Sequence, residues 1–511
     1  MPMDRLFRFA QRVMPKISVT ERIALQSGMP GIERHIFAGT MSPSTLSSYK
    51  PHAPSVTDQK MMKMLPELLS TVDEYDVMKN RATPREHPFW GTAKKRGFFG
   101  LIVPDEYGGN RMSNTGLSKL LQRLSSCSAS VPVHVMVPAS LGPAELISHY
   151  GTQQQKDSLL PELAAGAIPC FGLTSLHAGS DAAGSMTDTG VAYKRPDGSI
   201  GFRIHASKRY ITLAPVADII GIAFRVVDPD GLLERQYGQS VDGEITLALL
   251  RRGTRGLSAS EYTDPLGIGF SNGFVECHGT EISVDDVIGG ENGLGQGWKM
   301  LMEALAAGRG IALPAGAAGS SKMLTNATAA YSALRHQFKT PIGKFEGIRE
   351  KIAEMALATY EIDALVALMN TALDNGEKPP IFSAVLKQRS TELGRVVVNH
   401  AMDIVAGSAI CMGPQNFVAP AYFSTPVGIT VEGSNTMTRS LLIFGQGLIR
   451  SHPHLLDIVH AIEANDRQSF AMHVTQTVKS VVGLVLSVGG RGPLEEAVRF
   501  FALSANASLL L

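Results

Sequence analysis

The spacing of apolar residues changes twice along this 511-residue chain, and that change constrains its fold more than any other feature. From residues 57 to 166 and from 291 to 450, apolar residues recur at the three- and four-residue spacing of amphipathic helices. From 167 to 290, short β-rich runs alternate with turn signatures such as Pro196-Asp197-Gly198. The sequence therefore predicts an α+β fold with an N-terminal helical domain, a small antiparallel β module and a C-terminal helix bundle.

Local signals place individual elements. Asn114–Ser125 and Ile348–Met369 step by three and four and predict helices. Thr152 and Gln155 form a capping box that opens a helix, which Pro161 is expected to interrupt. The runs that predict strands are Arg203–His205, Ile219–Val226, Glu244–Leu249, Gly273–Cys277 and Glu281–Val287.

The two ends of the chain extend beyond this core. Residues 1–56 are predicted to be an irregular leader, rich in Pro, Ser and Met. Residues 451–511 are predicted to begin a C-terminal helical extension that stops within the apolar run Leu509–Leu511. A bundle cut at this point would expose apolar surface, so we expect the extension to be truncated.

Composition excludes several classes of protein. Hydrophobic residues make up 44% and charged residues 18%, which is typical of a folded chain. With 47 basic and 46 acidic residues the chain has no general field that would attract nucleic acid. The four cysteines form no CxxC pair, so no metal site is expected and a reducing cytoplasm fits. No stretch approaches the roughly 18 apolar residues of a membrane span.

The first 16 residues contain basic residues at helical spacing with apolar residues between them. They lack the apolar core and cleavage site of a signal peptide. Two interpretations remain open: a basic amphipathic helix that contacts the inner membrane peripherally, or a solvated first helix.

Two segments place reactive groups beside glycines. Cys170–Asp181 puts hydroxyls and glycines at the edge of the β module, where the backbone can approach a ligand closely. Ile429–Asn435 puts Glu432 beside Gly433 between two apolar runs. Taken alone, each segment also fits an ordinary turn or helix cap.

Taken together and in order, five motifs resemble the acyl-CoA dehydrogenase family, in particular its long bacterial type of fatty-acid β-oxidation. The resemblance runs from about Pro104 to Arg450. Its motifs are Pro104–Gly109, Leu173-Thr174 with Ala178–Asp181, Lys208–Thr212, Arg335–Phe338, and Glu432–Ser434 with Arg439.

The resemblance implies an enzyme that uses FAD to desaturate medium- to long-chain fatty acyl-CoA thioesters between the α and β carbons. Glu432 would take the α-proton while a hydride passes to flavin N5, with an electron-transfer flavoprotein as acceptor. Arg309 aligns with an arginine that positions the base, although a capping or surface arginine is an equal alternative. Some members carry the base next to this arginine, but here that residue is Gly308, which leaves Glu432.

The same resemblance assigns the binding residues. FAD would be bound by Phe171, Leu173, Thr174, Ser180, Tyr210, Thr212, Arg335, Phe338 and Gly407, and the substrate would contact Ser180 and Gly433. In the family, the residues matching Arg335 and Phe338 serve the FAD of a neighbouring subunit, which implies a homo-oligomer.

The chain departs from the family in two binding elements. His177 stands within the flavin loop, where a local contact and an exposed loop position are both open interpretations. Asp403, Ala406 and Ala409 alter the element that would bind the adenosine diphosphate of a second subunit, so FAD affinity is expected to fall. Two other functions therefore remain: an acyl-CoA oxidase or flavin hydroxylase on the same fold, or a truncated remnant without catalysis.

Overall fold

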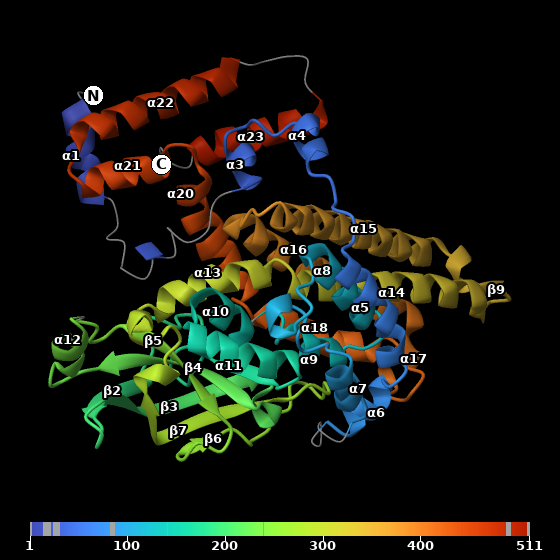
Figure 1. The fold of residues 1–511 in the computed structure, drawn as a ribbon. Coiled ribbons are helices and arrows are strands. Elements are labelled where there is room, and N and C mark those ends of the chain that lie inside the picture. The colour runs from blue at the N-terminus through green and yellow to red at the C-terminus, as the bar shows by residue number, and fades with distance from the viewer. Residues whose placement is uncertain are drawn as a thin grey trace.

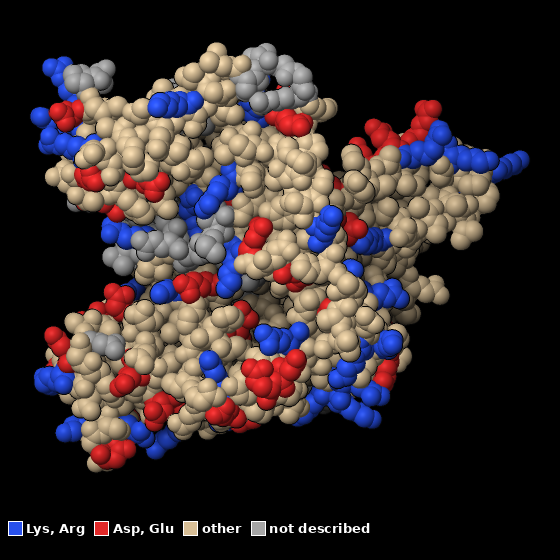
Figure 2. All heavy atoms as spheres, turned by 45° about the horizontal axis from the view of Figure 1, so that its top comes forward, with Lys and Arg blue, Asp and Glu red and all other residues tan. Residues whose placement is uncertain are grey.

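The computed structural model describes residues 3–13, 22–23, 31–81, 87–140, 142–238, 240–486 and 492–507. Figure 1 shows helices, a single large sheet and a helix bundle in the predicted order, so the α+β architecture is confirmed. Basic and acidic side chains are interspersed over the face seen in Figure 2. Among the described helices, none is long and apolar enough to cross a membrane.

The N-terminal helical part packs around buried leucines and aromatic residues. Its elements are α5 (Val56–Leu69), α6 (Glu74–Lys79), α7 (Phe89–Lys95), η2 (Asp105–Tyr107), α8 (Asn114–Ser125), α9 (Val131–Met136), α10 (Pro143–Tyr150) and α11 (Gln153–Ala164). The capping box of Thr152 and Gln155 is present. Pro161, however, does not interrupt α11, which continues to Ala164 because Leu160 and Leu163 are buried on either side of the proline.

The leader, expected to be irregular, contains helices that pack against the C-terminal extension. The leader helices are α1 (Met3–Val13), α3 (Glu33–Phe37) and α4 (Pro43–Ser48). α1 contacts α21 (Leu455–Glu463) and α22 (Arg467–Leu486), and α3 contacts α20 (Gly447–Ser451) and α23 (Pro493–Ala507). Phe7 stacks edge-on against Phe470 and Phe37 against Phe501. Long-range aromatic packing therefore orders a segment whose local signals are weak. Lys16 and residues 509–511 lie outside the described residues.

The sheet is mixed, which corrects the expectation of an antiparallel module. Its strands are β1 (Pro169–Gly172), β2 (Thr189–Lys194), β3 (Ile200–Thr212), β4 (Ile219–Val227), β5 (Ile245–Arg251), β6 (Leu257–Ser258) and β7 (Asn272–Ser283). β1 and β2 both pair parallel with β4, at successive stretches of it, while the other pairings are antiparallel. Parallel pairing needs a long crossover, and the chain between β1 and β4 supplies it.

Short helical elements lie between these strands or follow the last of them. They are η3 (Ala214–Val216), α12 (Leu232–Tyr237), η4 (Val284–Asp286) and η5 (Gly290–Gly293). The predicted strands Gly273–Cys277 and Glu281–Val287 belong to the single strand β7 and the turn η4. Gly279, with a φ of +67°, lies within β7 and separates the two runs in the sequence.

A buried ion pair ties the sheet together. The Lys208 side chain is 0% exposed, and its Nζ lies 2.7 Å from Oδ2 of Asp188. The same Nζ donates to the carbonyl of Leu173 at 3.0 Å, and the Ser207 N–H donates to Oδ1 of Asp188. Burial lowers the pKa of Lys208, while Asp188 acts against this shift. The pair therefore fixes β3 against both the end of β1 and the segment that precedes β2.

The bundle is built around α16, which contacts helices on several sides. Its elements are α13 (Gly297–Arg309), α14 (Ala312–Leu334), the hairpin β8 (His336–Gln337) and β9 (Thr340–Pro341), η6 (Ile342–Lys344), α15 (Glu346–Asp374), α16 (Pro380–Val405), α17 (Gly407–Ile410), α18 (Ala419–Thr430), α19 (Asn435–Met437) and the π-helix η7 (Thr438–Gln446). α13 packs on both α16 and β5, so it connects the bundle to the sheet.

Replacing Lys208 with Met tests the buried pair. The variant leaves a buried carboxylate at Asp188 without its cation, so we expect the β module to lose about 3–5 kcal/mol of unfolding free energy. The double variant Lys208→Met with Asp188→Leu should regain most of this loss, because no buried charge remains. Hydrogen–deuterium exchange of β2 and β3 in a urea series measures both, and equal losses in the two variants would contradict the assignment.

Candidate active site

Glu432 lies on a turn with two consecutive residues in the left-handed region. α18 ends at Thr430, and φ is +55° at Glu432 and +84° at Gly433. Ser434 then caps the short helix α19 by accepting a hydrogen bond from the Met437 N–H at 3.4 Å. Glycine adopts this region freely, whereas for a glutamate it costs roughly 1–2 kcal/mol. Other contacts must therefore hold the turn in place.

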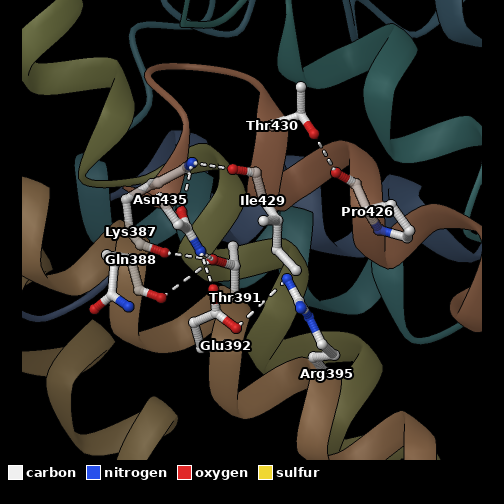
Figure 3. A network of polar contacts seen from close by, with 9 residues as sticks. All are labelled: Lys387, Gln388, Thr391, Glu392, Arg395, Pro426, Ile429, Thr430 and Asn435. Carbon is white, nitrogen blue, oxygen red and sulfur yellow. Dashed lines mark hydrogen bonds and ion pairs between the residues drawn. The ribbon is translucent and has the colours of Figure 1, made fainter. Parts of the chain in front are cut away.

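A lysine that the sequence analysis did not single out supplies those contacts. Lys387 of α16 is 0% exposed, and its Nζ donates to the Gly433 carbonyl at 2.8 Å and to the Ile429 carbonyl at 3.4 Å. It also donates to Oδ1 of Asn435 at 2.8 Å. Figure 3 shows how the Lys387 side chain reaches from α16 to both ends of the turn. The sequence offers one signal for this lysine. It follows the apolar Leu386 in a part of α16 where most residues are buried.

The amide of Asn435 extends this network back to α16. Its Nδ2 donates to Oγ1 of Thr391 and to Oε1 of Glu392, each at 2.9 Å. Arg395 in turn lies 3.5 Å from Glu392 (Figure 3). The turn is therefore anchored to α16 through three side chains along one face of that helix.

Arg309 shares the buried electrostatic environment of Glu432. The Glu432 residue is half-buried, but its Oε2 is shielded from solvent and has no hydrogen-bond partner among the described residues, and the same holds for Nε of Arg309. Burial raises the pKa of Glu432, while the charges of Arg309 and Lys387 act to lower it. Burial lowers the pKa of Lys387 to about 8 and also lowers that of Arg309, with Glu432 opposing both shifts. One carboxylate thus faces two cations in a site of low dielectric.

Two glycines let these groups approach. A Cβ at Gly433 would lie 3.1 Å from Oγ1 of Thr438 and 3.8 Å from Nη2 of Arg309, so the arginine lies close to the turn. A Cβ at Gly308 would lie 2.6 Å from the carbonyl oxygen of Ser140. A side chain at 308 therefore does not fit without movement of the backbone.

The predicted flavin residues of the sheet gather at one edge. Thr174 and Arg209 exchange backbone and side-chain hydrogen bonds at 3.1 Å, so the end of β1 lies beside β3. A bulge between Lys208 and Ile211 gives Tyr210 a φ of +61° and leaves its side chain 61% exposed. Thr212 ends the same strand, and Phe171 in β1 and Leu173 just after β1 are half-buried.

The remaining predicted residues lie elsewhere. Ser180 is exposed in the loop after β1. Arg335 and Phe338 belong to the β8–β9 hairpin, which projects from the bundle on the side opposite the sheet (Figure 1), and Phe338 is 91% exposed. Gly407 opens α17 on that same side, where a Cβ would meet no atom within 4 Å. Within one chain, the hairpin and α17 thus lie apart from the predicted flavin residues of the sheet.

The sheet edge fits the flavin that the resemblance implies. It combines the exposed aromatic ring of Tyr210 with the hydroxyl of Thr174, which donates to Arg209 and keeps lone pairs free to accept. Nearby, Oγ of Ser175 is buried without a hydrogen-bond partner among the described residues. An exposed ring and unsatisfied polar groups suit a planar heterocycle with a polar rim.

Comparison with known proteins matches both helical parts to one family. The model of the acyl-CoA dehydrogenase N-terminal domain matches residues 63–167, and that of the C-terminal domain matches residues 295–444. The order of helical domain, sheet and helix bundle is also the architecture of acyl-CoA dehydrogenases. The chain belongs to the acyl-CoA dehydrogenase family.

Curated relatives align across the sheet as well. A protein of Mycobacterium tuberculosis named probable acyl-CoA dehydrogenase FadE10 is 29% identical over 382 residues, covering 74% of this chain and 56% of the relative. The human mitochondrial very long-chain specific acyl-CoA dehydrogenase is 27% identical over 390 residues, with the same coverage of 74% and 56%. The chain thus spans about half the length of these relatives.

Solved structures share the fold at low identity. Butyryl-CoA dehydrogenase from Megasphaera elsdenii superposes with a TM-score of 0.67 at 21% identity, covering 78% of this chain and 100% of that one. A glutaryl-CoA dehydrogenase complex with glutaryl-CoA has a TM-score of 0.65 at 20% identity, covering 79% of this chain and 98% of that one.

Replacing Gly308 with Ala tests the close packing beside Arg309. The added methyl group would lie 2.6 Å from the Ser140 carbonyl, so α13 must shift, and we expect a loss of about 1–3 kcal/mol. Gly347→Ala is the matched control, because a Cβ there meets nothing within 4 Å and alanine favours the helix. Calorimetric unfolding should show a lower transition temperature for the first variant alone; an unchanged temperature would contradict this packing.

Proposed function

We propose that this chain catalyses FAD-dependent α,β-desaturation of a fatty acyl-CoA thioester. The observation that carries the proposal is the carboxylate of Glu432, whose shielded Oε2 has no hydrogen-bond partner among the described residues. It lies in the electrostatic reach of Arg309 and Lys387 and beside Gly433, which adopts a φ of +84°. Membership of the family supports the reaction class.

The reaction begins with the removal of a weakly acidic proton from the carbon next to the thioester. A base for this step must be unpaired, close and shielded from water. Burial raises the pKa of Glu432 and so makes its carboxylate a stronger base than an exposed glutamate. The Gly433 N–H would donate to the thioester carbonyl and stabilise the charge that develops on its oxygen.

FAD would be held at the sheet edge by Phe171, Leu173, Thr174, Tyr210 and Thr212. When bound, it supplies the hydride acceptor that the protein's own side chains lack. Tyr210 would pack against the ring system and the two threonines would orient it, while Ser180 would contact the pyrophosphate or substrate. Lys208 would hold this part of the sheet in place through its hydrogen bond to the Leu173 carbonyl.

The partners follow from the same proposal. Medium- to long-chain acyl-CoA would be the substrate and an electron-transfer flavoprotein the acceptor. Phe338 and Arg335 would reach the FAD of a second copy together with Gly407, which requires a homo-oligomer. The exposed ring of Phe338 on a projecting hairpin supports this arrangement, because a single chain gives the ring little apolar cover.

Glu432→Gln tests the base. The amide keeps the size of the side chain but cannot take up the α-proton, so FAD should remain bound while palmitoyl-CoA no longer bleaches it. In the unmodified protein, flavin reduction should fall as the pH drops through the raised pKa of Glu432, because only the carboxylate form acts as base. Anaerobic stopped-flow absorbance measures both. Bleaching at an unchanged rate in the variant would rule out Glu432 as the base.

The fate of the electrons separates the proposal from its rivals. A solved structure of an oxidase, the prolyl acyl carrier protein oxidase AnaB, shares this fold with a TM-score of 0.63 at 20% identity, covering 75% of this chain and 97% of that one. We expect the reduced protein to pass electrons to an electron-transfer flavoprotein faster than it forms peroxide in air-saturated buffer. Faster peroxide release would favour an oxidase, and a purified chain that binds no added FAD would favour the non-catalytic remnant.

A further inference from the structure

Lys387 is a buried cation that the proposed reaction does not require by itself. Its side chain is 0% exposed, and all three acceptors around its Nζ are neutral oxygens: two carbonyls and the Asn435 amide. An ammonium has three N–H donors, so these contacts saturate it. A buried charge without a directly bonded counter-ion is costly, and an apolar side chain would avoid that cost. Stability alone therefore does not account for a lysine at this position.

The acceptors of Lys387 all belong to the turn that carries Glu432. Ile429 lies before the two left-handed residues, Gly433 is the second of them, and Asn435 follows. One ammonium group thus contacts both ends of a turn that a glutamate adopts at a cost in energy. We propose that Lys387 is a positioning residue for Glu432, holding this turn in the conformation that aims the carboxylate at the substrate. The inference rests on the proposed function of Glu432.

The positive charge of Lys387 has a second effect on Glu432. The charged groups that act on the carboxylate are Arg309 from α13 and Lys387 from α16. Those that act on Lys387 are Glu432, Arg309 and Glu392, and Arg395 lies beside Glu392. Removing the Lys387 charge leaves Arg309 as the one remaining cation of this set that favours the Glu432 carboxylate. The pKa of Glu432 should then rise further, and more of the base should be protonated at neutral pH.

Lys387→Met is the principal variant, because it removes the donors and the charge but keeps an unbranched side chain. We expect the rate constant of flavin reduction by palmitoyl-CoA to fall roughly 10²-fold, the effect of misplacing a reacting group by about 1 Å. We also expect the acid limb of the pH–rate profile to move to higher pH. Lys387→Arg retains a cation with several donors and should keep the limb near its original position.

Two further variants separate the contributions. Asn435→Ala removes one acceptor without removing the cation, so the rate should fall while the acid limb stays near its place. Lys322→Met is the matched control, since its ammonium pairs with Asp363 on the surface with side chains 39% and 46% exposed, and neither readout should change. Absorbance of bound FAD and circular dichroism check that each variant folds.

Infrared spectroscopy gives a readout that does not depend on turnover. The difference between the protein and Glu432→Gln, recorded over a pH series, follows protonation of the Glu432 carboxyl, and Lys387→Met should shift it upward. If acyl-CoA never reduces the flavin of the unmodified protein, the proposed reaction is wrong. The infrared titration still tests whether Lys387 affects the protonation of Glu432. If folded Lys387→Met keeps both the rate and the titration of Glu432, the role of Lys387 is refuted. Should that variant not fold, an unchanged rate in folded Asn435→Ala refutes it equally.

Discussion

A buried carboxylate needs cations near it to remain charged and freedom from direct pairing to act as a base. The structure meets both conditions at Glu432, whose Oε2 has no hydrogen-bond partner among the described residues although Arg309 and Lys387 lie within its field. Burial and the two cations shift its pKa in opposite directions, so the balance between them sets its basicity. The positions of α13 and α16 determine that balance, because each helix supplies one cation.

Two buried lysines hold the main chain in place in the same way, by donating hydrogen bonds to carbonyl groups at two different places in the molecule. Lys387 donates to the carbonyl of Gly433, next to Glu432, and Lys208 donates to the carbonyl of Leu173, next to Thr174. In each case a long side chain inside the protein holds the main chain beside a residue with a proposed role. The two lysines differ in how their buried positive charge is balanced. Lys208 has the carboxylate of Asp188 at 2.7 Å, whereas the hydrogen-bond partners of Lys387 are neutral oxygens. Burial therefore lowers the pKa of Lys387 to about 8.

The parts that are far apart in sequence are joined by packing of the bundle. α13 contacts both β5 and α16, so it connects the sheet with the helix that anchors the turn carrying Glu432. At the N-terminal end of α16, Glu33 from the leader is buried and accepts a hydrogen bond from the Ile381 N–H. Leader and C-terminal helices thus form one layer above the N-terminal end of the helix that positions the candidate base (Figure 1).

The sequence by itself determined the order of helix, sheet and helix, because apolar periodicity depends only on local geometry. It also predicted helix Asn114–Ser125 and the capping box at Thr152 for the same reason. The family resemblance pointed to Glu432 as the candidate base and left the role of Arg309 open. Tertiary structure alone decided the parallel pairing of β1 and β2 with β4, the continuation of α11 past Pro161 and the helices of the leader. It alone also revealed Lys387, since a lysine in a helix carries no local sign of the carbonyls it will meet. Such contacts join residues more than forty positions apart, and only packing brings them together.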